Sequence, residues 1–220
     1  MCVIAAKPKG TPMPSDETLW NLWNANPGGA GIMYNLLHTK TLVRIRKGFM
    51  TFTELMDALD LLVMDELQEQ EQTIVFHFRR MKNHNPAYTH PYPIDRPDHI
   101  LDLECNCHLG VAQNGIIRTE KADFGESRNM TFTKRILSPM YEDEPYFLDV
   151  ASTRNLLYRT TNCRMAFLYG DGSLRLVGEF QQHNGIYYSN FKFDQCPKEL
   201  DETTESSYNL CEGVKKYAGK

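Results

Sequence analysis

The sequence predicts one domain of the α+β class, in which helices and mainly antiparallel strands share a core. Three observations lead to this expectation. The chain has 220 residues, 41% of them hydrophobic, which suffices for one sizeable core and is short for two. A run of β-branched and aromatic residues at 73–78 indicates a buried strand. The spacing of apolar residues after Thr51 indicates an amphipathic helix.

Residues 2–50 predict three strands and one helix. Apolar runs at 2–6 and 32–34 are typical of strands, and a glycine-rich turn before the second run lets the backbone bend tightly. Between them, residues 16–23 indicate a short helix. The segment 42–46 alternates apolar and basic residues, so we expect its arginines on the solvent-facing side of a strand rather than in a phosphate site.

The strongest helix signal begins at Thr51. Thr51 and Glu54 have the spacing of a capping box, in which each side chain accepts a hydrogen bond from the other residue's backbone. Apolar residues then recur at helical spacing, at Phe52, Leu55, Met56, Leu59, Leu62 and Val63. We interpret this stripe as core packing rather than as the lining of a ligand site. The polar residues 65–72 indicate a solvated helix end or loop.

The middle of the chain predicts two buried strands and a long loop. The strand at 73–78 ends at Arg79. Four prolines disfavour regular structure over 81–98, so we expect an ordered loop of the kind that shapes pockets. A second strand at 109–112 runs into Asn114-Gly115, a strong turn signal whose simplest interpretation is a plain hairpin.

The last third predicts two helices, a hairpin and a final strand. The helices cover 127–137, halted before Pro139, and 147–158. The hairpin covers 165–177 and the strand 185–190. Beyond Asp194 the chain becomes polar. We therefore expect a single domain over residues 1–194 and a loosely held tail over residues 195–220.

Composition and charge argue against several classes of protein. The formal net charge of -4 gives no general attraction to nucleic acid or to anionic lipid, so neither partner is expected. No apolar run approaches the roughly 18 residues that span a bilayer, and no signal peptide opens the chain. Six cysteines in a chain of this size and apolar content favour a reduced cytoplasm over a disulfide scaffold.

One cluster contains side chains that ligate metals. It is Cys105-Asn106-Cys107-His108, with His99 upstream. Structural zinc sites usually join two separated pairs of ligands, whereas these are crowded together. Reduced cysteines in a loop are the favoured interpretation and zinc is the alternative, so we expect no metal and no cofactor.

Cys2 is the most reactive group that the sequence offers. If Met1 is removed, which the small side chain of Cys2 would permit, one residue carries both a thiol and a free α-amine. Such an amine has a pKa near ~8, so it can accept the proton of the neighbouring thiol at neutral pH. The alternative is a buried cysteine that begins an edge strand.

Five motifs occur in a fixed order: Met1-Cys2, the glycine turn at 28–31, His77-Phe78-Arg79, Thr89-His90-Pro91 and Asn114-Gly115-Ile116-Ile117. Together, over residues 2–190, they resemble the glutaminase domain of the class II glutamine amidotransferases, which are N-terminal nucleophile hydrolases. The closing pattern over 178–190 is also similar to small free-standing members of that family that are frequent in bacteriophage genomes.

The resemblance implies a four-layer αββα sandwich with Cys2 at the end of one sheet. It implies that the Cys2 thiol attacks the amide carbon of glutamine or a related amide, with its α-amine as proton shuttle. The Asn114 amide and the Gly115 N–H would stabilise the resulting oxyanion. Arg79 would bind the substrate carboxylate, and His90 would belong to the same pocket.

The sequence departs from the family pattern at three places. Arg80-Met81-Lys82-Asn83 and Gln113 replace the usual residues. Ser127-Arg128-Asn129 aligns with a segment whose aspartate receives the substrate ammonium, and a cation at Arg128 would repel that group by several kcal/mol at ~4 Å and an effective dielectric near ~20. Glu126 is the alternative ammonium partner. Otherwise the pocket suits an anionic amide or a substrate with no amine.

Two functions of different classes follow. The first is an amide hydrolase that releases ammonia, and because 220 residues cover only a glutaminase domain, any ammonia-accepting enzyme would be a separate chain. The second is a non-catalytic interaction protein that keeps the fold with a degenerate pocket. Bile-salt and penicillin acylases also begin with cysteine, but the ordered Arg79, His90 and Asn114 set favours the amidotransferases. We expect the protein in the cytoplasm, of the host if it is encoded by a phage.

Overall fold

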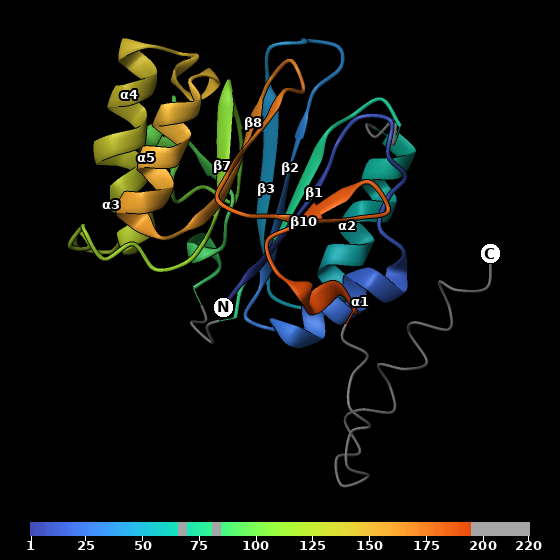
Figure 1. Ribbon diagram of the computed structural model, residues 1–220. Helices are drawn as coiled ribbons and strands as arrows, with labels where there is room; N and C mark the ends of the chain where they lie inside the picture. Colours follow the sequence, from blue (N-terminus) through green and yellow to red (C-terminus); the bar gives the residue numbers. More distant parts are fainter. Residues whose placement is uncertain (66–69, 81–84, 195–220) are drawn as a thin grey trace, which may run out of the picture.

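The structure, a computed structural model, describes residues 1–65, 70–80 and 85–194. Two antiparallel sheets form its centre, and helices lie on both outer sides of them (Figure 1). The α+β class expected from the sequence is therefore confirmed at this level.

The larger sheet has seven strands in the order β10-β11-β1-β4-β2-β3-β6. Their bounds are β1 Val3–Lys7, β2 Ala30–Asn35, β3 Val43–Phe49, β4 Ile74–Phe78, β6 Glu104–Cys107, β10 Gln181–His183 and β11 Ile186–Tyr188. The smaller sheet has the order β5-β7-β8-β9. Its strands are β5 Tyr92–Pro93, β7 Leu109–Asn114, β8 Arg164–Tyr169 and β9 Leu174–Val177. Every described strand pair is antiparallel, as expected.

The helices divide into two groups. The first contains α1 Asp16–Ala25 and α2 Phe52–Asp65. The second contains α3 Arg128–Phe132, a π-helical turn η3 at Thr133–Leu137, α4 Ser138–Asp143 and α5 Ala151–Thr161. Short 3-10 turns are η1 Pro86–Tyr88, η2 Pro97–His99, η4 Phe147–Asp149 and η5 Phe191–Asp194. In Figure 1 the two groups stand on opposite sides of the strands.

Three clusters of buried apolar residues hold these elements together. One joins Leu22 of α1 and Leu55 of α2 to Phe76 of the larger sheet. A second joins Leu157 of α5 to Val111 of the smaller sheet. The third contains residues of both sheets, namely Ile4, Ala6, Met33, Val43, Ile45, Val75, Cys105, Cys107, Ala112, Ala166 and Leu168. The two sheets therefore pack face to face, because side chains of both meet in one cluster.

The elements at residues 2–80 agree well with the sequence. The capping box of α2 is present, with the Glu54 N–H donating to Thr51 Oγ1 at 3.1 Å and the Thr51 N–H donating to Glu54 Oε2 at 3.1 Å. On β3, Arg44 and Arg46 are half-buried and pair with Glu104 at 3.3 and 3.6 Å. The arginines of this strand thus have a carboxylate partner.

Several expected elements differ in the structure. The helix expected to stop before Pro139 continues to Asp143, because Pro139 occupies the first turn of α4, where its missing N–H breaks no helical hydrogen bond. The second helix, expected from 147, begins at Ala151 after a 3-10 turn. Part of the expected loop, Tyr92–Pro93, pairs with β7 as an edge strand, a position that tolerates proline.

Two turns and loops expected from the sequence are also corrected. Cys105 and Cys107 lie in β6 rather than in a loop, and both are buried between the sheets. Asn114-Gly115 ends β7, but no strand follows it as a hairpin partner before α3, so the plain hairpin interpretation is wrong. Instead, β7 pairs with β8, and Asn114 lies opposite Arg164, fifty residues later in the chain.

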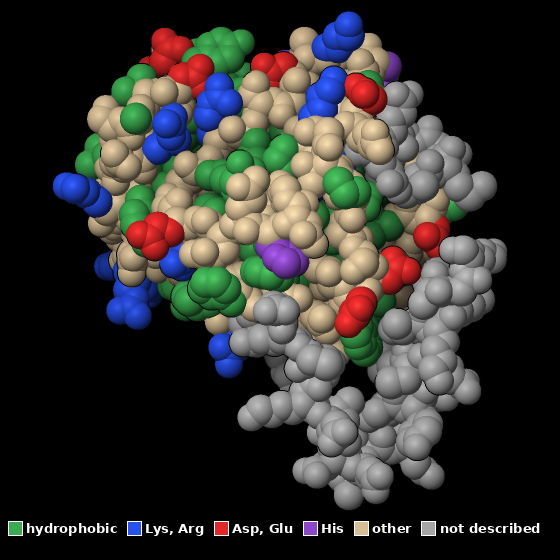
Figure 2. Space-filling view, turned by 45° about the vertical axis from the view of Figure 1, so that its right-hand side comes forward, with side chains coloured by type: hydrophobic (Ala, Val, Ile, Leu, Met, Phe, Trp, Pro, Cys, Tyr) green, Lys and Arg blue, Asp and Glu red, His purple; other side chains and the backbone are tan. Residues whose placement is uncertain are grey.

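Parts of three expected segments lie outside the described residues: 66–69 of the polar stretch 65–72, 81–84 of the long loop, and the tail 195–220. Among the described residues, no helix has the length and apolar character required to cross a bilayer. On the face drawn in Figure 2, side chains of both charges occur among large uncharged areas, so the described part of this face has no continuous basic field.

Candidate functional site

The ends of four strands place the predicted catalytic residues in one region. β1 pairs with β4 so that Val3 lies opposite Phe78, and β2 pairs with β4 so that Ala30 also lies opposite Phe78. Extending the first register by one residue places Cys2 opposite Arg79. The Arg79 N–H donates to Gly29 O at 2.8 Å, and the Gly28 N–H donates to Arg79 O at 2.7 Å. The glycine turn therefore lies beside Arg79.

Because side chains alternate along a strand, Cys2, Arg79 and Asn114 each lie on the side of their sheet that faces the other sheet. Ile4 of β1, Val75 of β4 and Ala112 of β7 belong to the cluster between the sheets. Side chains alternate with a period of two, so Cys2, Arg79 and Asn114 share the facing of those residues. Cys2 is half-buried and not in a disulfide, and its carbonyl accepts a hydrogen bond from Asn190 Nδ2 at 2.8 Å. Cys2 thus directly precedes β1, which pairs with β11 on one side and with β4 on the other.

Arg79 is a buried cation at the end of β4. Burial lowers the pKa of its guanidinium. The nearby Tyr92, Cys2 and Tyr88 act in the opposite direction without cancelling this effect. Arg79 Nη1 donates to Asn85 O at 3.4 Å. Burial also raises the pKa of Tyr92, whose phenol donates to Tyr88 O at 2.9 Å. Cys2, Tyr88 and Tyr92 thus lie close enough to Arg79 to influence its charge.

Asn114 is tied to the start of β1 through a serine. Its Nδ2 donates to Ser189 Oγ at 2.8 Å, and the same oxygen accepts the Ile4 N–H at 2.9 Å. Asn114 and Ser189 are both buried. The Asn114 Oδ1 has no hydrogen-bond partner among the described residues. The end of the smaller sheet is thereby connected to the strand that carries Cys2.

Gly115 has a backbone that only glycine adopts readily. Its φ is +149°, and a Cβ built on it would lie 2.4 Å from Cys163 Sγ. Asn129 of α3 fixes this turn, because its Nδ2 donates to Gly115 O at 3.1 Å and its Oδ1 accepts the Ile117 N–H at 3.3 Å. In the described part of the chain the Gly115 N–H has no acceptor. That N–H is therefore available to a bound group.

His90 is buried among other rings and polar side chains. Its ring lies 4.4 Å from that of His77 and 4.1 Å from that of Tyr92, and it is buried. His90 Nε2 contacts Gln113 Oε1 at 3.4 Å, and His77 Nε2 contacts Gln113 O at 3.2 Å. Burial lowers the pKa of His77 to about 3 and the pKa of His90 well below its ordinary value. Both imidazoles are neutral near pH 7.

A buried lysine lies beside the Tyr92 ring of this group. Lys47 Nζ donates to Ala87 O at 3.0 Å and to Ile100 O at 2.6 Å, and it lies 4.5 Å from the centre of the Tyr92 ring. Burial lowers the pKa of this ammonium to about 7. The loop that contains His90 is therefore attached to β3 by direct hydrogen bonds.

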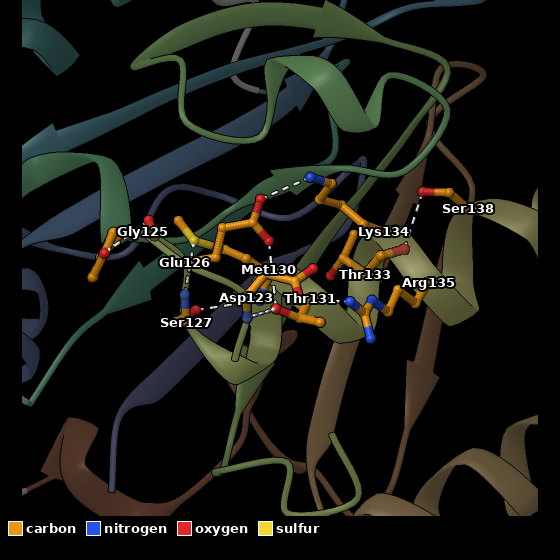
Figure 3. A network of polar contacts seen from close by, with 11 residues as sticks. Asp123, Gly125, Glu126, Ser127, Met130, Thr131, Thr133, Lys134, Arg135 and Ser138 are labelled. Carbon is orange, nitrogen blue, oxygen red and sulfur yellow. Dashed lines mark hydrogen bonds and ion pairs between the residues drawn. The ribbon is translucent and has the colours of Figure 1, made fainter. Parts of the chain in front are cut away.

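The two charged residues expected to meet the substrate amine differ in their surroundings. Glu126 is nearly buried, and its carboxylate accepts Lys134 Nζ at 2.7 Å and Thr131 Oγ1 at 3.4 Å (Figure 3). Arg128 is exposed at the first residue of α3. The Glu126 carboxylate is thus already engaged by a lysine, and Arg128 reaches solvent.

Two cavities lie away from this region. One of about 350 Å³ is lined by residues including His108, Tyr146 and Gly170. A neighbouring one of about 400 Å³ is lined by residues including Lys9, Thr73 and Gly172. Because these residues flank the opposite ends of β1, β4, β7 and β8, neither cavity contains the Cys2 thiol. Within the described ranges, no three His, Cys, Asp or Glu side chains gather as a metal site.

Three residues of this region were not predicted as site residues. Ser189 and Asn129 hold the positions of Asn114 and Gly115, and Gln113 connects the two buried histidines. Ser189 directly follows the final strand, but its partners in sequence lie 75 and 185 residues away. No local pattern reports contacts over such separations. For Asn129, the cap residue Ser127 indicated the helix start but not the bond to Gly115.

A scan of protein-family models, a search of curated proteins and a search of solved structures each found no match to this chain.

Proposed function

We propose that this protein is an amide hydrolase of the class II glutamine amidotransferase type, with Cys2 as its nucleophile after removal of Met1. Its substrate is glutamine or a related anionic amide, and it releases ammonia. One observation carries the proposal: the register of β1 against β4 aligns Cys2 with Arg79, and Ser189 ties Asn114 to the same strand end.

The proposal includes the four-layer αββα sandwich of the N-terminal nucleophile hydrolases. The three apolar clusters support it, because they lie between the first helices and the larger sheet, between the sheets, and between the smaller sheet and the last helices. In this arrangement the nucleophile starts an interior strand of one sheet, and the oxyanion donors end a strand of the other.

The proposed reaction has two halves. The α-amine of Cys2 takes the thiol proton, and the sulfur adds to the amide carbon. Asn114 Nδ2 and the Gly115 N–H donate to the oxyanion, for which each donor can contribute ~2.7–4 kcal/mol. Collapse breaks the C–N bond, and ammonia leaves with the proton from the α-ammonium. Water then attacks the thioester, the amine takes a proton from it, and carboxylate and thiol are released.

Arg79 has the chemistry of a carboxylate binder. Its charge persists despite burial, because an arginine pKa lies far above neutral pH. A guanidinium presents parallel N–H groups that match both oxygens of a carboxylate. Its position opposite Cys2 would hold an anionic substrate with the amide carbon near the thiol. Met1 is 62% exposed, which suits its removal by an aminopeptidase.

The proposal is tested by two measurements on purified protein. Intact mass reports whether Met1 is absent. Glutamate release from glutamine is then compared between wild type and Cys2→Ala, with Cys105→Ala as the control because Cys105 is an unpaired, buried thiol in β6. We expect activity in the wild type and in Cys105→Ala, and none in Cys2→Ala. Equal activity with and without the Cys2 thiol would remove it from the mechanism.

A second candidate is an interaction protein that keeps this architecture without catalysis. The contact between Glu126 and Lys134 favours it, since the carboxylate proposed to receive a substrate ammonium is occupied. Retention of Met1 together with absence of amide hydrolysis would select this candidate. Hydrolysis of an amide that lacks an α-amine, in preference to glutamine, would instead retain the enzyme and change its substrate.

A further inference from the structure

Ser189 connects the two sheets at the proposed site. It directly follows β11, and its N–H donates to Ile4 O at 3.0 Å. In return its Oγ accepts the Ile4 N–H at 2.9 Å. The Ser189 hydroxyl therefore accepts a backbone N–H of β1 in place of the carbonyl of a neighbouring strand. That N–H belongs to Ile4, two residues after Cys2.

The same hydroxyl determines how the Asn114 amide is oriented. Two N–H donors, from Ile4 and from Asn114 Nδ2, converge on one oxygen, at 2.9 and 2.8 Å. All three residues are buried, so water does not substitute freely for that oxygen. Asn114 Nδ2 carries two hydrogens, and Ser189 uses one of them. The second hydrogen is left for a bound oxyanion.

Loss of the hydroxyl would favour the opposite amide orientation. The Ile4 N–H would lack its acceptor, which is costly for a buried donor. The Asn114 Oδ1 has no partner among the described residues and belongs to the amide that shares this hydroxyl, so rotation of the amide would offer the Ile4 N–H an acceptor. Such a rotation exchanges Nδ2 for Oδ1. An oxygen then faces the developing oxyanion where a donor is required.

We propose that Ser189 is a positioning residue that holds the Asn114 amide with its nitrogen toward the start of β1, where Cys2 lies. This inference rests on the proposed function. Asn190 adds to the same device, since its Nδ2 donates to Cys2 O at 2.8 Å. Adjacent residues thus fix the nucleophile and its oxyanion donor relative to each other.

The test is Ser189→Ala, assayed with the amide that wild type hydrolyses. We expect kcat to fall 10- to 100-fold, somewhat less than deletion of an oxyanion donor, while KM stays within about twofold. Ser189→Thr keeps a hydroxyl and should recover most of kcat. Ser189→Cys retains the side-chain size with a weak acceptor, and it should repeat the alanine result if the alanine variant does not fold.

Ser138→Ala is the matched control. Ser138 is also buried and also makes two hydrogen bonds through its hydroxyl, to Ile94 O at 2.6 Å and to Thr133 O at 3.0 Å, but it lies in α4. We expect it to lower thermal stability without a comparable loss of kcat.

A second readout separates positioning from packing. The affinity of Cys2 for an aldehyde analogue of the substrate depends on the oxyanion donors, whereas its alkylation by iodoacetamide does not. Ser189→Ala should weaken the aldehyde at least 10-fold and leave the alkylation rate nearly unchanged. Unchanged kcat and aldehyde affinity in Ser189→Ala would overturn this inference alone. A wild type without Cys2-dependent amide hydrolysis would overturn the proposed function and this inference with it.

Discussion

At the scale of single residues, two constraints on side-chain size and backbone geometry coincide at Gly115. Its φ of +149° and its approach to Cys163 are separate constraints, one from backbone geometry and one from packing. The sequence indicated a turn at Asn114-Gly115, because that pair is typical of turns. It did not indicate why glycine is needed, because Cys163 approaches from a different strand end.

Gly115→Ala should lower the free energy of unfolding by about 2–4 kcal/mol, from backbone strain together with the clash against Cys163. Removing Cys163 Sγ by Cys163→Ala should recover part of the loss, because the strain of the positive φ remains. Urea denaturation of the four proteins of this double-mutant cycle measures both parts.

Gly125→Ala provides the control for strain without a clash. Gly125 has a φ of +77°, and no atom lies within 4 Å of its added Cβ. Its loss should be about 1 kcal/mol. Equal losses in Gly115→Ala and Gly125→Ala would mean that Cys163 does not restrict Gly115.

A second residue-scale prediction concerns His77 and pH. Burial lowers the pKa of His77 to about 3 from 6.5. Between pH 3 and pH 6.5 the unfolded chain binds a proton at His77 that the folded chain does not. The contribution of neutral His77 to the stability of the fold is therefore fully present above pH 6.5 and is lost as pH falls toward 3. The loss reaches up to ~1.4 kcal/mol per pH unit.

His77→Gln removes this titration and keeps a donor for Gln113 O. Its free energy of unfolding should therefore change less steeply with pH than that of wild type. Urea midpoints of both proteins at pH 4, 5, 6 and 7 measure the difference. Parallel curves for the two proteins would contradict the assignment of this acid sensitivity to His77.

At the scale of elements, the sequence predicted those features that depend on hydrogen bonds between residues close together in the chain. The start of α2 followed from Thr51 and Glu54, whose reciprocal hydrogen bonds span only three residues. The helix near Pro139 was predicted too short, because proline was interpreted as a stop. The π-helical turn before α4 restarts the hydrogen-bond pattern, and Pro139 then lies in a first turn.

Thr133 is the residue that fixes this π-helical turn to the smaller sheet. Its hydroxyl donates to Asn129 O at 2.9 Å and accepts Gln113 Nε2 at 3.2 Å. Thr133→Val keeps the side-chain shape but leaves the buried Gln113 donor without an acceptor. We expect a loss of about 1–3 kcal/mol in the free energy of unfolding, measured by urea denaturation.

Thr160→Val in α5 is the matched control, because its hydroxyl also bonds back along a helix, to Leu156 O at 2.8 Å, but it is exposed. Its effect should stay below about 0.5 kcal/mol. A loss of similar size in both variants would locate the effect in the valine side chain and not in the bond to Gln113.

At the scale of the whole molecule, most of the strands were predicted from the sequence, but their order in the sheets was not. Hairpins such as β8–β9 follow from neighbouring residues, whereas β1 lies between β4 and β11, and β7 pairs with β8 across three helices. These pairings depend on buried faces that meet only after folding. For the same reason, the grouping of Cys2, Arg79 and Asn114 in one site was predicted from the family resemblance and not from their spacing in the sequence.

The cluster between the sheets predicts that both halves unfold together. Both tryptophans, Trp20 and Trp23, lie in α1, whereas Leu157 is buried on the far side of the smaller sheet. Leu157→Ala should lower the free energy of unfolding by about 2–5 kcal/mol and shift the tryptophan-fluorescence and far-ultraviolet circular dichroism midpoints equally. A fluorescence midpoint that stays at its wild-type value would reveal two independently unfolding halves.

The interior position of β1 has a consequence for biosynthesis. Its neighbour β11 begins at Ile186, so β1 is made long before the strand that covers one of its edges. At typical elongation rates of ~5–20 residues per second, this interval lasts roughly 10–40 s. During it one edge of β1 is open, and the proposed removal of Met1 has time to occur before the sheet closes.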